Sequence, residues 1–149
     1  MKTFATILFA AGVCAFADER PPERELQSYL TSPSERGSVF AQGTLDGVDY
    51  RKLLRGAVAK EAGSLAGIFR YTANGKLMGE GAESNCDILR QLLRLWGDKA
   101  YARVLAVQSP KVRAAVIGAL DYTWPHPGWK PTQYPLTYRL AKHDTSYRQ

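Results

Sequence analysis

The chain has 149 residues, a formal net charge of +6 and two cysteines, which fits one domain of ordinary size. Lys and Arg are scattered, with no aromatic–basic recognition motif, so we expect no nucleic-acid partner. Two histidines and singly spread carboxylates offer no ligand set with metal spacing, and we predict neither a metal site nor a cofactor.

The first 17 residues predict a secretory signal peptide. Lys2 supplies the positive start, residues 4–16 carry no charge, and Ala15 and Ala17 are small residues at the two positions that a signal peptidase inspects. This apolar run is too short for a transmembrane helix, which needs about 20 residues. We therefore expect cleavage near Ala17 and a secreted or periplasmic protein, whose net charge falls to +5 because only Lys2 is lost.

The cysteines leave one alternative open for processing. Cleavage before Cys14 with acylation would make a lipoprotein, although the large Val13 fits that signal poorly. After cleavage at Ala17 the chain keeps only Cys86, which excludes an intramolecular disulfide. A disulfide-linked dimer through Cys86 remains an alternative.

Residues 18–47 are polar and interrupted by proline and glycine. One short helix is predicted over 23–30, with Leu26, Tyr29 and Leu30 on one face. The remainder offers little apolar surface to offset the entropy of ordering, so we expect a flexible lead-in.

Between 48 and 140, apolar residues recur at steps of three or four, and no stretch alternates with a period of two. Asn85 and Asp98 are predicted N-caps, and Ser109 is a cap before a proline at the first helical position. We predict one all-α domain in which about five helices stack as antiparallel hairpins, in an irregular bundle or a short solenoid. The expected helices are 49–61, 65–72, 85–96, 98–107 and 110–122, and 74–83 is expected to be an irregular glycine-rich loop.

From Thr123 onward, proline and aromatic residues replace the helical pattern, and 141–149 is expected to be a tail. These rings either dock on the last helices as a cap or leave an exposed edge for a sugar ring or an extended partner. The candidate binding residues are Trp124, His126, Trp129, Tyr134 and Tyr138.

Residues 97–122, GDKAYARVLAVQSPKVRAAVIGALDY, resemble a HEAT-type helical-repeat unit: a short helix, a tight turn and a second helix that begins at a proline. The glycine-rich 74–83 stretch departs from a regular repeat. The resemblance implies stacked antiparallel helices and, by analogy, a binding role rather than catalysis.

No catalytic residue is assigned. Cys86 near a predicted helix start is a weak candidate nucleophile, with His126 or His143 as base. Glu80 and Glu83 form a candidate acid pair in the predicted loop.

The sequence thus favours a non-enzymatic interaction or structural module whose partner is a protein or an envelope polymer. This partner would bind to the C-terminal aromatic edge or to the 74–83 stretch. The alternative is a small hydrolase of wall or secreted polymers, using Glu80, Glu83 or Cys86. A third possibility is a surface-associated protein held by its basic charge.

Overall fold

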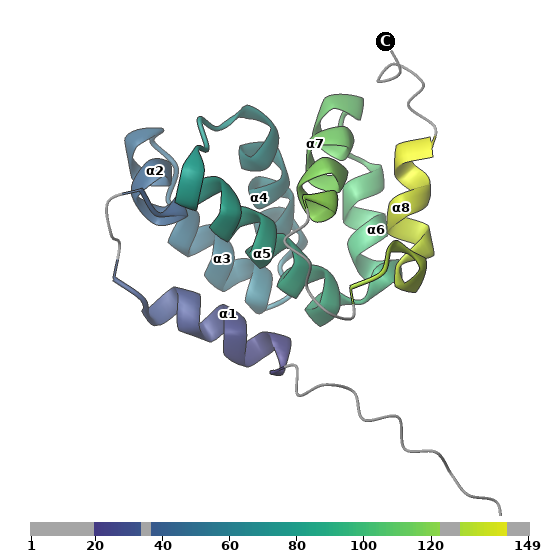
Figure 1. Cartoon of the computed structure of the whole chain (residues 1–149), viewed down its shortest axis with the longest axis horizontal. Helices are drawn as coiled ribbons and strands as arrows, with labels where there is room; N and C mark the ends of the chain where they lie inside the picture. The colour runs from purple at the N-terminus through teal and green to yellow at the C-terminus, as the bar shows by residue number, and fades with distance from the viewer. Residues whose placement is uncertain (1–19, 34–36, 123–128, 143–149) are drawn as a thin grey trace, which may run out of the picture.

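The computed structural model describes residues 20–33, 37–122 and 129–142, and this part of the chain is all-α, as predicted (Figure 1). The predicted signal peptide, Trp124, His126 and most of the predicted tail lie outside the described residues. Eight α-helices and one 3-10 helix are described, rather than about five helices. They are α1 (Pro22–Thr31), α2 (Val39–Leu45), α3 (Tyr50–Val58), α4 (Ala62–Asn74), α5 (Gly79–Trp96), α6 (Asp98–Ala106), α7 (Pro110–Asp121), η1 (Pro131–Gln133) and α8 (Pro135–Lys142).

The long helix α5 lies at the centre of the bundle and packs on α1, α2, α3, α6 and α7. Its predicted apolar stripe is buried: Ile88, Leu89, Leu92 and Leu93 have no exposed surface. Helices α3 and α4 pack on one another as consecutive neighbours, whereas α7 packs chiefly on α4, and α6 chiefly on α8. A single core therefore connects the described helices, including those on either side of the 74–83 stretch.

A buried hydrogen-bonded chain fixes α5 against α3 and α4. The Tyr50 hydroxyl donates to Asn85 Oδ1 at 2.8 Å, and Asn85 Nδ2 donates to Thr72 Oγ1 at 3.1 Å. The prediction of Asn85 as an N-cap is therefore wrong, because α5 begins at Gly79 and Asn85 lies inside it, 1% exposed. A short polar side chain is typical both of a cap and of a satisfied core amide, and the local sequence does not separate the two.

The N-terminal segment differs from the expected flexible lead-in. The short helix predicted over 23–30 is present as α1, and a second helix, α2, follows it. Leu26 and Val39 are fully buried, and the Phe40 ring meets Tyr50 edge-on at 5.8 Å. The ordering comes from contacts with residues far along the chain, such as the 2.8 Å hydrogen bond from the Tyr29 hydroxyl to Asp87, which a count of local apolar residues does not anticipate.

Helix limits also shift at the 74–83 stretch, where α4 extends to Asn74 and α5 already begins at Gly79. One predicted cap is confirmed: Ser109 accepts a hydrogen bond from the backbone N–H of Val112. The structure adds a second cap, because the Asp49 carboxylate accepts from the backbone N–H of Lys52 at the start of α3. Between α5 and α6, Gly97 has φ +72°, a left-handed conformation that favours glycine.

Asp98 caps a different helix from the predicted one. It is the first residue of α6, and its carboxylate accepts hydrogen bonds from the backbone N–H groups of Leu136 and Thr137, both at 2.8 Å. These donors open α8, so one side chain at the start of α6 satisfies the positive end of α8 and fixes the C-terminal segment to the bundle.

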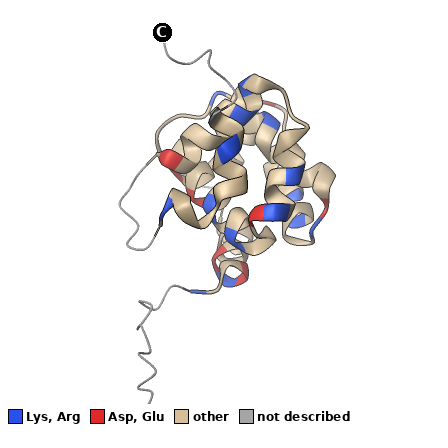
Figure 2. Ribbon diagram, turned by 90° about the vertical axis from the view of Figure 1, so that its right-hand side faces the viewer, with Lys and Arg blue, Asp and Glu red and all other residues tan. Residues whose placement is uncertain are grey.

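Basic residues are distributed over most of the helices, with fewer acidic residues between them (Figure 2). Within the described ranges only two ion pairs form, Arg20 with Glu25 and Arg90 with Asp87. Among these residues, no helix has the combination of length and hydropathy that crossing a bilayer requires.

Candidate functional site

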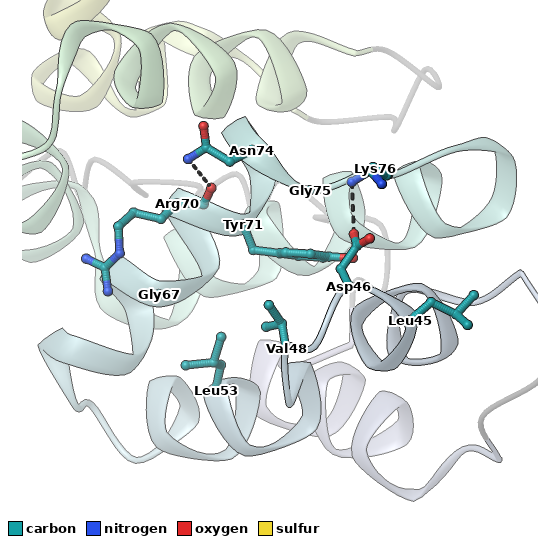
Figure 3. A pocket seen from close by; sticks show the side chains of 10 residues that line it. All are labelled: Leu45, Asp46, Val48, Leu53, Gly67, Arg70, Tyr71, Asn74, Gly75 and Lys76. Atoms are coloured by element: carbon teal, nitrogen blue, oxygen red, sulfur yellow. Dashed lines mark hydrogen bonds between the residues drawn. The ribbon is translucent and has the colours of Figure 1, made fainter.

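A groove of about 660 Å³ runs between α2, α3 and α4, a volume within the usual range for small-ligand sites (Figure 3). Its apolar wall consists of Val48, Leu53 and the Tyr71 ring, and Leu45 stands at one end. Gly67 allows α4 to come close to α3, since a Cβ there would lie 2.7 Å from a Leu53 methyl group. The remaining lining residues are Asp46, Arg70, Asn74, Gly75 and Lys76.

Among the described residues that line the groove, Asp46 is the one carboxylate, and it already has partners from the chain itself. Asp46 Oδ2 accepts from the Tyr71 hydroxyl at 3.0 Å and from the Lys76 backbone N–H at 2.9 Å. The hydrogen bond from the Lys76 backbone, then that from Tyr71, lower the pKa of Asp46 and keep it ionised. The Asp46 carboxylate therefore holds the 75–76 turn against the end of α2.

The cationic side chains of the groove differ from Asp46 in having fewer partners within the chain. Arg70 and Lys76 are exposed, and neither side chain forms an ion pair with the described residues. In Figure 3 the Arg70 guanidinium lies at one end of the apolar wall, and Lys76 at the other, beside Asp46. The Lys111 ammonium donates to Asn74 Oδ1 at 2.8 Å and adds a third cation at the rim. The site therefore combines an apolar wall with a net positive rim.

The predicted aromatic site is divided by the structure. Trp124 and His126 lie outside the described residues, whereas Trp129, Tyr134 and Tyr138 pack partly buried against the core. The Trp129 and Tyr134 rings stack with centroids 4.8 Å apart and planes at 25°. Two rings that stack on each other have less free face for a ligand than two separate rings would offer.

Tyr138 borders a second cavity of about 490 Å³, which Asp121 and Arg139 also line. Its hydroxyl lies close to the Trp129 indole N–H and to Asp121, but neither buried group forms a hydrogen bond of good geometry with the described residues. Burial, together with the nearby Asp121 charge, raises the pKa of Tyr138 to about 12. Burial also raises the pKa of Asp121.

Cys86 does not occupy the predicted first turn of a helix, because α5 begins seven residues earlier, at Gly79. The residue is 8% exposed, and burial raises the pKa of its thiol despite the neighbouring Arg90. Such a thiol is a poor nucleophile and is poorly placed for an intermolecular disulfide. No disulfide is seen in the described structure.

Glu80 and Glu83 are both exposed on α5, and Glu80 borders a cavity of about 200 Å³, next to Tyr29 and Phe40, which Glu83 does not line. Among the residues that the structure describes, no three Cys, His, Asp or Glu side chains gather in a way that could hold a metal ion.

The groove was only partly accessible to sequence reasoning. The Asn74-Gly75 turn signal and the 74–83 stretch were predicted as a possible contact edge, and Asn74, Gly75 and Lys76 do line the groove. No sequence pattern singles out Arg70. Helical spacing does not reveal that residues of α2, α3 and α4 line one groove.

Comparison of the chain with protein-family models, with curated proteins and with solved structures finds no match. The resemblance of 97–122 to a HEAT-type unit stays a prediction.

Proposed function

We propose that this chain is an exported, non-enzymatic binding module whose α2–α4 groove holds the anionic group of an amphiphilic ligand. The observation that carries the proposal is that Asp46 is satisfied by the chain itself, while Arg70 and Lys76 form no ion pair with the described residues. An anionic ligand gains Arg70 and Lys76 as charge partners there, and although the charge of Lys76 also acts on Asp46, the ligand has no ion pair of the described residues to break.

The apolar wall defines the rest of the ligand. Val48, Leu53 and the Tyr71 ring offer a surface that an anion alone would leave in contact with water. A short alkyl or other apolar group next to the charge would cover this surface, each buried methylene contributing about 0.8 kcal/mol. The preferred ligand class is therefore a carboxylate or phosphate attached to a short apolar group.

The hydrolase alternative has no comparable support. Catalysis by a pair of acids needs two carboxylates that face one cleft, and Glu80 borders a cavity that Glu83 does not line. The buried Cys86 lacks the electropositive, accessible setting of a reactive thiol.

Titration calorimetry with octyl phosphate tests the proposal, with octyl glucoside as the uncharged control ligand. We expect octyl phosphate to bind and octyl glucoside to bind at least tenfold more weakly. The variant Arg70→Gln/Lys76→Gln should weaken octyl phosphate binding about tenfold or more, since each charge-assisted contact is worth roughly 1 kcal/mol at an exposed site.

The matched control is Arg55→Gln/Lys99→Gln, which removes two exposed cations, one from the second half of α3 and one from the start of α6, that do not line the groove. It should bind octyl phosphate like the unmodified chain. Equal binding by the two double variants would show that the groove is not the site.

A further inference from the structure

The three most exposed large apolar side chains in the described part of the chain are Leu45, Val107 and Met78, at 87%, 81% and 73% exposed. Single exposed apolar residues are ordinary on protein surfaces. These three come from the end of α2, the turn after α6 and the residue before α5, which are far apart in sequence. All three nevertheless lie at one end of the bundle.

Hydrogen bonds bring the three segments to one end of the bundle. Gln42 in α2 bonds the backbone of Met78 through both amide atoms, at 2.9 Å each. Asp46, next to Leu45, accepts from the Lys76 backbone, which places the 75–78 turn beside the end of α2. The contact of Lys111 with Asn74 then connects the start of α7 to the end of α4.

We call this surface the groove end and define it as Leu45, Asp46, 74–78 and 107–111. Its turns lie in the upper part of Figure 1. One mouth of the groove opens here, since Leu45, Asp46 and Lys76 belong to both.

The charge of the groove end is positive. Lys76 and Lys111 are exposed among the apolar side chains, Arg70 follows along the groove, and Asp46 is the one acidic residue in the ranges that define the surface. Exposed aliphatic side chains on turn tips, flanked by lysines, are the combination that partitions into the headgroup region of an anionic bilayer. Protein interfaces are instead enriched in aromatic residues and depleted of lysine at their centre.

We propose that the groove end docks on an anionic membrane surface, with Leu45, Met78 and Val107 inserted among the headgroups and Lys76 and Lys111 against the lipid phosphates. The inference rests on the proposed groove function in one respect, because it names a membrane lipid as the source of the anionic amphiphile. Docking itself needs only the exposed side chains and their charges.

Co-sedimentation with vesicles tests docking on the full chain. We expect binding to vesicles of phosphatidylglycerol and phosphatidylcholine in equal parts, with an affinity at least tenfold lower for pure phosphatidylcholine. Binding should weaken as salt rises from 50 to 500 mM, because the electrostatic part is screened. Leu45→Ser/Val107→Ser should lower the affinity about tenfold or more, and so should Lys76→Glu/Lys111→Glu.

The matched control is Tyr122→Ser/Leu136→Ser, which removes two exposed apolar side chains outside the groove end, at the end of α7 and the start of α8. All variants share the same N-terminus, so a contribution of residues 1–17 to vesicle binding cancels in the comparison. Circular dichroism confirms that each variant is folded.

The outcomes separate docking from groove binding. Octyl phosphate binding together with no preference for anionic vesicles overturns docking and leaves the groove function standing. Vesicle binding that survives Arg70→Gln but fails in Leu45→Ser/Val107→Ser supports docking without the groove. Equal vesicle binding by the groove-end and control variants overturns docking, and binding of a soluble acidic peptide in place of vesicles identifies a protein partner instead.

Discussion

The α3–α5 centre of the bundle and the C-terminal unit (129–142) both pack on the same core, but they differ in how far their buried polar groups are hydrogen-bonded. At the centre, Tyr50, Thr72 and Asn85 satisfy one another. In and under the C-terminal unit, Tyr101, Trp129, Thr137 and Tyr138 each bury a polar side-chain atom that has no hydrogen-bond partner among the described residues. The centre is therefore specified by matched polar contacts, whereas the C-terminal unit is held by apolar burial and the Asp98 cap. The first arrangement should be rigid and the second easier to open.

Asn85→Ala should give the largest loss, about 3 kcal/mol of unfolding free energy, because it leaves the buried Tyr50 hydroxyl and the Thr72 hydroxyl without their amide partner. Urea denaturation measures the change. A loss below about 1 kcal/mol would contradict the idea that this chain specifies the centre. The double variant Asn85→Ala/Tyr50→Phe should recover part of the loss, since it removes the orphaned hydroxyl as well.

Gly97→Ala should cost about 2 kcal/mol, although a Cβ there meets no atom within 4 Å. The cause is the backbone, because φ is +72° and ψ is 155°, a combination that residues other than glycine avoid. Gly118→Ala is the control, as its added Cβ also meets nothing and its helical backbone suits alanine. Thermal melting of both variants measures the two effects. An equal decrease in melting temperature for Gly97→Ala and Gly118→Ala would rule out backbone strain at Gly97 as the cause.

Asp98→Ala should lower stability by about 1–2 kcal/mol by removing both caps of α8. The effect should be local: amide hydrogen exchange should accelerate over 135–142 and stay unchanged over α5. Asp98→Asn keeps one acceptor oxygen, so its loss of stability should lie between that of Asp98→Ala and that of the unmodified chain, which is zero. Acceleration spread evenly over all helices would instead place Asp98 in the central core.

Raising the pH should weaken the C-terminal unit through Tyr138. Burial raises the pKa of Tyr138 to about 12 in the folded chain, against about 10 when unfolded. Burial disfavours the ionised phenol, so stability does not depend on this group below pH 10 and is lost as the pH rises from 10 towards 12. After discounting for the partial exposure of the ring, the unmodified chain should lose about 0.5–1 kcal/mol relative to Tyr138→Phe between pH 8 and 11. A constant difference across that range would mean that the phenol is solvated.

Tyr138→Phe at pH 7 should have the smallest effect, within about 0.5 kcal/mol or slightly stabilising. It removes a buried hydroxyl that has no partner and keeps the ring. Urea denaturation of Tyr138→Phe and of Asn85→Ala under the same conditions compares the loss of unfolding free energy in the two regions. A loss above 1 kcal/mol would show that the Tyr138 hydroxyl is satisfied after all.

The elements that the sequence predicts well are those whose signals are local. The Ser109-Pro110 cap and the apolar stripe of α5 need only the residues within one or two turns. Asp98 and Asn85 were assigned to the wrong roles because their partners are 38 and 35 residues away. Helix α2 was missed for the same reason, since it packs on α5 and its Gln42 bonds the backbone of Met78, 36 residues along the chain.

The candidate site follows the same rule. The turn at Asn74-Gly75 is a local signal, and both residues line the groove. The pairing of Asp46 with Tyr71 and Lys76 is a tertiary event, so the difference between a satisfied acid and two cations without ion pairs is not visible in the sequence.

The central claim is that the groove end, and not the C-terminal aromatic unit, is the contact surface of this protein. Hydrogen exchange of the full chain with and without phosphatidylglycerol vesicles tests it most directly, since one measurement reports on both regions. We expect slower exchange over 45–48, 74–79 and 107–111, with 129–142 unchanged. Slower exchange confined to 129–142 would contradict it and would assign the contact to Trp129, Tyr134 and Tyr138.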